Sequence, residues 1–255
     1  MAIPDVIKGL LENGVHFGHL SKHWNPKMKK FIFGKKKNIY IIDLEKTAQK
    51  LEEAKEFIRK VILDGKKVLF VSTKRQLREL IKEKGQECGM PYIAERWVGG
   101  FLTNFSTIRD RVKRYVSLRE QKERGDFENM PRKEVGRLER QLSRMEKNYS
   151  GVMALEDFPG CIFVIDPKKE ASCIKEATRS DIPIVGLIDT DADPELLNYP
   201  IPGNDDAIKS VRYIISSIAE TIKEASKELN LKSDDSDDKK MEEDKSKNAE
   251  SSGKA

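Results

Sequence analysis

The chain has few of the residues on which several protein classes depend. Its 255 residues include only three cysteines, and aromatic residues make up 7%. Cys88, Cys161 and Cys173 form no CxxC pair, which argues against a disulfide scaffold or a thiolate zinc site and favours buried thiols in a reducing compartment. No apolar run approaches the roughly 18 residues of a membrane span. The N-terminal segment has no apolar leader and contains Asp5 and Glu12, so we expect no secretory or organelle-targeting peptide.

Motifs of nucleotide-dependent enzymes are also missing. Neither GxGxxG nor GxxxxGK[ST] occurs, which disfavours an enzyme that binds a dinucleotide or a nucleoside triphosphate. Ser72 and Ser106 have no histidine nearby in sequence, so no nucleophile and base are paired. We therefore predict no catalytic residue and no required cofactor. An α/β enzyme that binds a phosphorylated ligand remains the alternative, because hydroxyls and cations in Val71–Arg75 follow a strand and open a helix.

Charged residues are abundant and unevenly distributed. They make up 36% of the chain, which carries a net charge of +5. Residues 231–255 contain six lysines, eight acidic residues and almost no apolar side chain, which predicts a disordered low-complexity tail. Residues 106–150 contain thirteen basic and eight acidic residues, so most of the excess positive charge lies there. This distribution points to a polyanionic partner.

Short apolar runs alternate with helical segments over most of the chain. Continuous apolar strands that alternate with helices are typical of a parallel sheet covered on both faces, which predicts an α/β fold for residues 1–104 and 150–230. The expected strands are Asn38–Asp43, Lys67–Ser72, Tyr92–Ala94, Cys161–Asp166 and Ile184–Asp189. The expected helices are Leu44–Leu63, Lys74–Cys88, Lys169–Arg179 and Asp205–Leu229.

Residues 105–149 interrupt this alternation with two helical stretches around a turn at 125–131. Apolar residues in both stretches recur at alternating spacings of three and four, the spacing of a coiled-coil seam. We predict an antiparallel coiled-coil hairpin that protrudes from the sheet domain without joining its core. The seam residues are Phe105, Ile108, Val112 and Tyr115 in the first stretch and Val135, Leu138, Leu142, Met145 and Tyr149 in the second.

Two basic regions are candidates for contact with nucleic acid. Leu20–Lys37 contains seven lysines, no acidic residue and interleaved aromatic side chains, a combination that suits RNA phosphates and bases. The alternative is a solvated loop whose aromatics pack on the domain. In the hairpin, Arg109, Arg111, Lys113 and Arg114 fall within six residues, and arginine favours bidentate phosphate contact. A salt-bridged surface coiled coil is the alternative there.

A divalent metal, zinc or magnesium, is a weaker hypothesis. His19 with Asp189 and Asp205 could supply imidazole and carboxylate ligands, although their spacing matches no metalloenzyme pattern. The alternative assigns Asp205 to helix capping and Asp193 to a turn before Pro194. A metal-dependent hydrolase that uses His19 and these aspartates is the corresponding enzyme hypothesis.

Six collinear motifs resemble the ribosomal protein S2 family of the bacterial small subunit. Each is weak alone, but together they cover roughly residues 1–225 in the family's order. They are Gly14–His19, Trp24–Met28, Ile39–Leu44, Thr73–Gln76, Glu95–Gly100 with Leu102–Phe105, and Ile201–Ala207.

The resemblance implies a flavodoxin-like sheet domain with a protruding coiled coil. It also implies a non-catalytic role in the cytoplasmic small ribosomal subunit of a bacterium, or less readily a plastid. The implied partners are 16S rRNA near the junction of head and body, neighbouring proteins, and ribosomal protein S1, with no membrane and no small-molecule substrate. We expect packing for Trp97 and a sharp turn at Gly99 and Gly100. The predicted rRNA-binding residues are Lys22, Trp24, Asn25, Lys27, Lys29, Lys30, Lys35, Lys36, Lys37, Lys74, Arg75, Arg78, Arg96, Asn104, Arg109, Arg111, Lys113 and Arg114.

Overall fold

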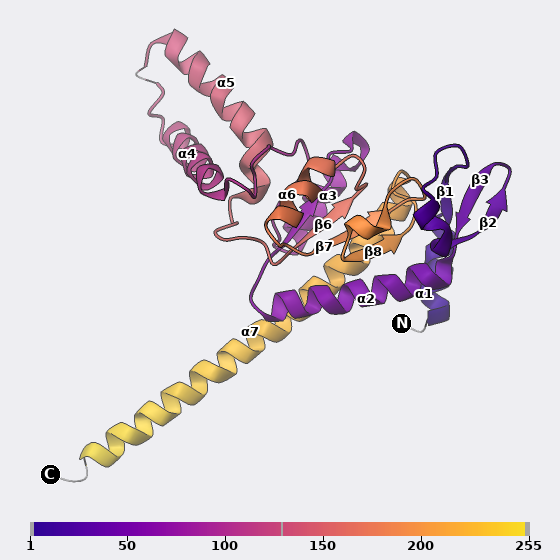
Figure 1. Ribbon diagram of the computed structural model, residues 1–255. Coiled ribbons are helices and arrows are strands. Elements are labelled where there is room, and N and C mark those ends of the chain that lie inside the picture. Colours follow the sequence, from indigo (N-terminus) through magenta and orange to yellow (C-terminus); the bar gives the residue numbers. More distant parts are fainter. Residues whose placement is uncertain (1–2, 129, 253–255) are drawn as a thin grey trace.

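The computed structural model contains two sheets and a helical projection (Figure 1). It describes residues 3–128 and 130–252, and the side chains of residues 5–128 and 130–231. The larger sheet occupies the centre, the smaller sheet lies near the N-terminal helix, and the projection leaves the opposite side.

The larger sheet is parallel and has five strands in the order β5-β4-β6-β7-β8. With β4 as the first strand of the sheet, this is the 2-1-3-4-5 order of flavodoxin-like folds, so the predicted fold class is confirmed. Every residue of β4, β6 and β7 is buried, as expected for strands covered on both faces. The strands are β4 (Val68–Val71), β5 (Tyr92–Ile93), β6 (Cys161–Ile165), β7 (Ile184–Ile188) and β8 (Tyr199–Pro202).

Helices pack on both faces of this sheet. Alternate strand residues point to opposite sides, so Phe70 and Phe163 belong to one core and Leu69 and Ile162 to the other. The first core is covered by α1 (Ile3–Glu12), α2 (Leu44–Leu63), α3 (Arg78–Glu87) and α7 (Ile208–Ser252). The second is covered by α6 (Ala171–Arg179) and the segment 97–105.

The smaller sheet corrects one strand assignment. The run Asn38–Asp43 does not join the parallel sheet; its residues form β3 (Ile39–Ile42), which pairs antiparallel with β1 (Phe17–Leu20) and β2 (Ile32–Lys36). Lys37 and Asn38 connect β2 to β3 with φ values of 47° and 64°. Positive φ at both central residues favours a tight hairpin, which pairs β3 with its sequence neighbour.

Two helices, α4 (Phe105–Glu123) and α5 (Arg132–Tyr149), form the projection (Figure 1). Within the predicted seam, Tyr115 of α4 and Leu138 and Leu142 of α5 are buried. The apolar cluster continues from these helices to the face of the sheet that α6 covers. The prediction that the hairpin does not join the core of the sheet domain is therefore wrong at the base of the projection. The coiled-coil geometry of the pair stays a prediction.

The C-terminal helix α7 extends to Ser252, through most of the segment predicted to be disordered. Its first part packs on the sheet through Val211, Ile214, Ile218 and Ile222, all fully buried. The side chains of 232–252 and all of 253–255 lie outside the described residues. The disorder predicted for 231–255 therefore stays a prediction.

Candidate nucleic-acid interface

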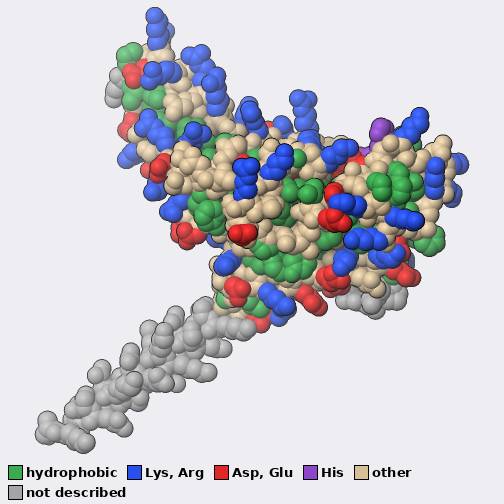
Figure 2. All heavy atoms as spheres, viewed as in Figure 1, with side chains coloured by type: hydrophobic (Ala, Val, Ile, Leu, Met, Phe, Trp, Pro, Cys, Tyr) green, Lys and Arg blue, Asp and Glu red, His purple; other side chains and the backbone are tan. Residues whose placement is uncertain are grey.

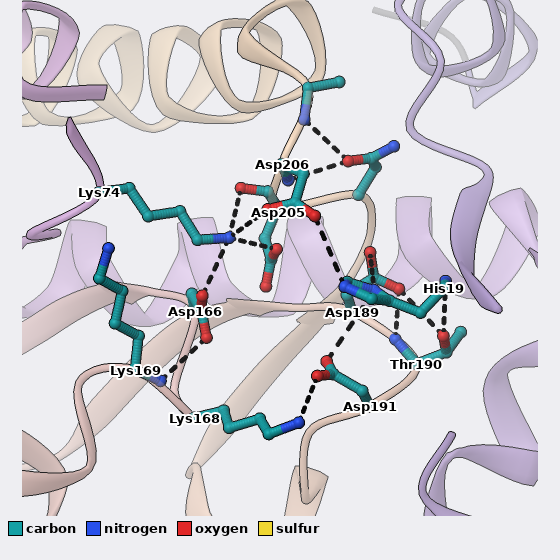
Figure 3. A network of polar contacts seen from close by, with 12 residues as sticks. His19, Lys74, Asp166, Lys168, Lys169, Asp189, Thr190, Asp191, Asp205 and Asp206 are labelled. Carbon is teal, nitrogen blue, oxygen red and sulfur yellow. Dashed lines mark hydrogen bonds and ion pairs between the residues drawn. The ribbon is translucent and has the colours of Figure 1, made fainter. Parts of the chain in front are cut away.

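The carboxyl ends of the parallel strands hold a network of charged side chains (Figure 3). Lys74, which follows β4, is buried, and its Nζ lies 2.9 Å from Asp166, 2.6 Å from Asp205 and 2.8 Å from Asp206. Asp166 follows β6, and the two other aspartates follow β8. The sheet topology thus brings these residues to the switch point, where open α/β sheets bind ligands.

The pKa values in this network reflect burial and mutual attraction. Burial opposes the charge on Lys74, but attraction by the three aspartates outweighs it and raises the pKa of Lys74. Burial raises the pKa of Asp205 to about 7, against the attraction of Lys74 and with repulsion from Asp166 and Asp189. Lys74 is buried among three carboxylates, so the network itself accounts for the positions of Lys74 and Asp205. RNA contact by Lys74 stays a prediction.

His19 of β1 joins the antiparallel sheet to the same network. Its Nδ1 lies 2.9 Å from Asp189 Oδ2, and its Nε2 lies 3.5 Å from Asp206 Oδ2. The backbone N–H of His19 also donates to Thr190 Oγ1 at 2.9 Å. Hydrogen bonding to Asp189 raises the pKa of His19 to about 9, although burial opposes the charged form.

The predicted metal ligands are not assembled into a site. His19 contacts Asp189, but Asp205 is turned toward Lys74. Throughout the described part of the chain, no group of three His, Cys, Asp or Glu side chains is placed to hold a metal ion. Lys74 occupies the centre of the acidic cluster and supplies the positive charge that a metal ion would otherwise supply.

Three further predicted cations have partners within the protein. Lys27 Nζ lies 2.8 Å from Asp193 Oδ2 and also contacts Glu195. Arg78 lies 2.8 Å from Glu95, and Arg109 lies 3.9 Å from Asp157. These contacts hold loops against helices or strands, and they reduce the charge available to an external anion.

The lysines of the small sheet remain exposed. Among the described residues, Lys35, Lys36 and Lys37 form no ion pair. The small sheet that carries them lies at the edge of the molecule remote from the hairpin. Five further predicted rRNA-binding cations are also exposed and form no ion pair in the described residues. The set comprises Lys22, Lys29, Lys30, Lys35, Lys36, Lys37, Arg75 and Arg96.

The predicted aromatic and amide contacts are engaged locally. Trp24 packs on Tyr40, with ring centroids 4.9 Å apart, and is partly buried. Asn25 Oδ1 accepts from the backbone N–H of Lys27 and caps a short helix (Pro26–Phe31). Asn104 Oδ1 accepts from the Thr107 hydroxyl at 2.8 Å. RNA contact by these three side chains stays a prediction.

Glu176 of α6 anchors the base of the hairpin, a role that no sequence motif predicts. Its carboxylate accepts from Trp97 Nε1 at 3.0 Å and from the backbone N–H groups of Gly100 and Leu102 at 2.9 and 3.0 Å. The packing expected of Trp97 is confirmed, since it is 8% exposed. Gly100 has φ 82°, which suits the sharp turn predicted there.

The hairpin carries exposed cations on both helices (Figure 2). On α4, Arg111, Lys113 and Arg114 are exposed. On α5, Arg137, Arg140 and Arg144 are also exposed, and they line a shallow groove with Gln141 and Met145. The residues predicted to bind rRNA include the α4 group but not the α5 group, whose members are dispersed along the chain. Their helical spacing was the available signal.

The family comparison decides the class of this protein. A model described as Ribosomal protein S2 matches residues 10–225. The chain belongs to the ribosomal protein S2 family. It is 50% identical over 218 residues to "Small ribosomal subunit protein uS2" of Coprothermobacter proteolyticus, covering 86% of this chain and 81% of the relative. It is 47% identical over 236 residues to the protein of the same name from Dictyoglomus thermophilum, covering 90% and 96%.

Family membership confirms a structural, non-enzymatic component of the small ribosomal subunit. It overturns the alternative of an α/β enzyme, in agreement with the cation and three carboxylates at the switch point. No helix among the described residues is long and apolar enough to cross a membrane.

Proposed function

We propose that the protein binds 16S rRNA near the junction of head and body through cations that lack an internal carboxylate partner. It acts in the cytoplasm of a bacterial cell and helps dock ribosomal protein S1. The observation that carries the rRNA proposal is the separation of two kinds of cation. Lys74, Lys27 and Arg78 each have a carboxylate partner within the protein. Among the described residues, the lysines at 35–37 and Arg137, Arg140 and Arg144 of the hairpin are exposed and have none.

Phosphate contacts from these exposed cations position the protein, and the shape of the folded rRNA supplies specificity. The small sheet and the hairpin lie on opposite sides of the large sheet (Figure 1). Contacts at both would fix the orientation of the sheet domain, because two separated attachment points remove rotation about either one.

Sedimentation tests the rRNA proposal. We expect the tagged chain in a bacterial lysate to migrate with small subunits and whole ribosomes through a sucrose gradient, and to stay bound through a moderate salt wash. The proposal is wrong if the chain stays at the top of the gradient. Nuclease digestion of the rRNA is the control, and it should release the chain.

Docking of ribosomal protein S1 is supported by the family resemblance and is tested separately. Small subunits purified from cells depleted of this protein should carry less ribosomal protein S1, and adding the purified chain back should restore it. Unchanged occupancy in the depleted particles would contradict the docking role and leave rRNA binding intact.

A further inference from the structure

We propose that the basic face of α5 is a binding surface for an RNA phosphate backbone. This face comprises Lys133, Arg137, Arg140, Gln141, Arg144 and Asn148. The inference rests on the proposed rRNA-binding function and assigns it a specific surface on the hairpin.

Helical periodicity collects these cations on one side of α5. Lys133, Arg137, Arg140 and Arg144 are separated by four, three and four residues, and residues at such spacings share one helix face. From Arg137 to Arg144 the row extends about 10 Å along the helix axis, at about 1.5 Å per residue. The buried side of the helix, with Leu138 and Leu142, points elsewhere.

Acidic residues of α5 are segregated from this row. Glu139 and Glu146 are seven residues apart and share a different side of the helix, where Glu139 lies 3.2 Å from Lys122 of α4. Glu134, in the first turn, lies beside the row and is the acidic residue nearest to it in the helical pattern. The basic face therefore keeps most of its positive charge.

Among the described residues, Arg137, Arg140 and Arg144 have no carboxylate partner. Other residues make the ion pairs of the hairpin: Arg119 with Glu123, Lys122 with Glu139, and Arg124 with Asp126. Within the described ranges, none of Arg137, Arg140 and Arg144 forms an ion pair. Arg140 Nε donates to the Gly136 carbonyl at 2.9 Å, which orients its guanidinium along the helix surface.

The shape and chemistry of this face fit a polymer of phosphates. Arg137, Arg140, Gln141, Arg144 and Met145 line an open groove. Guanidinium groups bind phosphate with two parallel hydrogen bonds, and an amide side chain can contact sugar or phosphate oxygens. A protein partner is less suited, because protein interfaces are built around buried aromatic or aliphatic anchors, and Met145 is the one apolar residue among those that line the groove. Figure 2 shows Lys and Arg side chains along the outer edge of the projection.

The run of cations on α4 provides a contrast. Arg109, Arg111, Lys113 and Arg114 are close in sequence, but consecutive helical residues are rotated by about 100° and so point in different directions. Arg109 also contacts Asp157. The denser cluster in the sequence is the more dispersed one in space.

Rebinding to small subunits that lack this protein tests the proposal. The full-length triple variant R137Q/R140Q/R144Q is compared with the wild type and with a matched control, R119Q/K122Q/R124Q. The control removes the same number of charges from the same hairpin, but from ion-paired residues. Dissociation constants are measured over a series of potassium chloride concentrations at fixed magnesium, and circular dichroism verifies folding.

We expect the arginine-face variant to bind about 10- to 100-fold more weakly. Its log–log salt slope should fall by about 2 to 3, since each phosphate contact contributes roughly 0.7 to 0.9. The control should stay within about threefold of the wild type. Unchanged affinity of the arginine-face variant, or equal losses in both variants, would overturn the assignment. Failure of the wild type to rebind would instead contradict the proposed function.

Site-specific crosslinking identifies what lies against the face. A photoreactive maleimide is attached to Gln141→Cys, which is selective because the three native cysteines are buried and burial raises their thiol pKa values. We expect the bound, irradiated protein to crosslink to 16S rRNA. Crosslinks to a ribosomal protein without any to RNA would overturn the proposal. The matched control, Ser117→Cys on α4, should give a lower yield with RNA.

Discussion

The network around Lys74 and the basic face of α5 use the same kind of charge for different purposes. Lys74 is 7% exposed and lies within 3 Å of three carboxylates, each supplied by a loop that follows a strand. The arginines of α5 are exposed and have no such partner in the described structure. One arrangement joins parts of the protein to each other, and the other leaves charge for a partner.

The placement of acidic residues decides whether a basic residue stabilises the fold or can bind a partner. Substitution of one member of a buried ion cluster leaves the other charges buried without a partner, which strongly destabilises the folded state. An exposed cation contributes little to stability, but it can displace counterions from a polyanion. Substitutions in the two regions should therefore affect different measurements.

Removal of the Lys74 charge should have the largest effect on stability. In Lys74→Met, Asp166, Asp205 and Asp206 face one another without their cation. We expect the free energy of unfolding in urea to fall by about 3–5 kcal/mol. The double variant Lys74→Met/Asp205→Asn, which removes one repelling charge, should recover part of this loss. A loss below about 1 kcal/mol would show that the network is not a structural cluster.

Neutralising Glu176 should have the next largest effect. Both carboxylate oxygens of Glu176 accept hydrogen bonds from the 97–102 segment. In Glu176→Gln only one oxygen remains to accept them, and the negative charge is lost. We expect a loss of about 1.5–3 kcal/mol, the range for hydrogen bonds to a charged group. Hydrogen exchange should accelerate at the amides of Gly100 and Leu102. Unchanged exchange there would exclude Glu176 as the anchor of the hairpin base.

His19 should make stability depend on pH. Its folded pKa, about 9, is above the ordinary value of 6.5, so its contribution is fully present below pH 6.5 and is lost as pH rises through 9. We expect wild-type stability to decline across this range by on the order of 1–2 kcal/mol more than that of His19→Gln. Urea titrations at pH 6, 7.5 and 9.5 measure this difference. Parallel curves for the two proteins would rule out the His19–Asp189 pair as its source.

Neutralising the exposed lysines should have the smallest effect on stability. Lys35→Gln, Lys36→Gln and Lys37→Gln remove charges from a β-hairpin without breaking an ion pair in the described structure. We expect the triple variant to unfold within about 0.5 kcal/mol of the wild type. A loss above about 1.5 kcal/mol would mean that these lysines have a structural role like that of Lys74.

Much of the fold was predictable because its strands are strongly apolar. The strands within the runs at 67–72, 161–166 and 184–189 are buried on both faces. Burial on both faces requires a continuous apolar run, and such a run can be recognised in the sequence. β8 escaped prediction because Tyr199–Pro202 contains two prolines, which suit an edge strand but not the expected pattern. The strand at 39–42 was assigned to the wrong sheet, since a short apolar run does not reveal its partner.

The candidate interface was less predictable because pairing depends on distant residues. Local sequence placed Lys74 at a strand end, but its partners lie 92 to 132 positions further along the chain. The basic face of α5 could have been predicted from the helical spacing of Arg137, Arg140 and Arg144 alone. The prediction relied on the density of cations at 109–114 instead, and density does not determine which side chains share a face.

The salt concentration at which the protein leaves the small subunit distinguishes cations that have an internal partner from cations that have none. Gradient sedimentation is performed on wild type, on K35Q/K36Q/K37Q, and on K50Q/K55Q/K82Q, whose lysines are ion-paired to neighbouring glutamates. We predict that only K35Q/K36Q/K37Q is released at lower salt. Equal shifts in both variants, or none in either, would contradict the claim that cations without internal partners hold this protein on the ribosome.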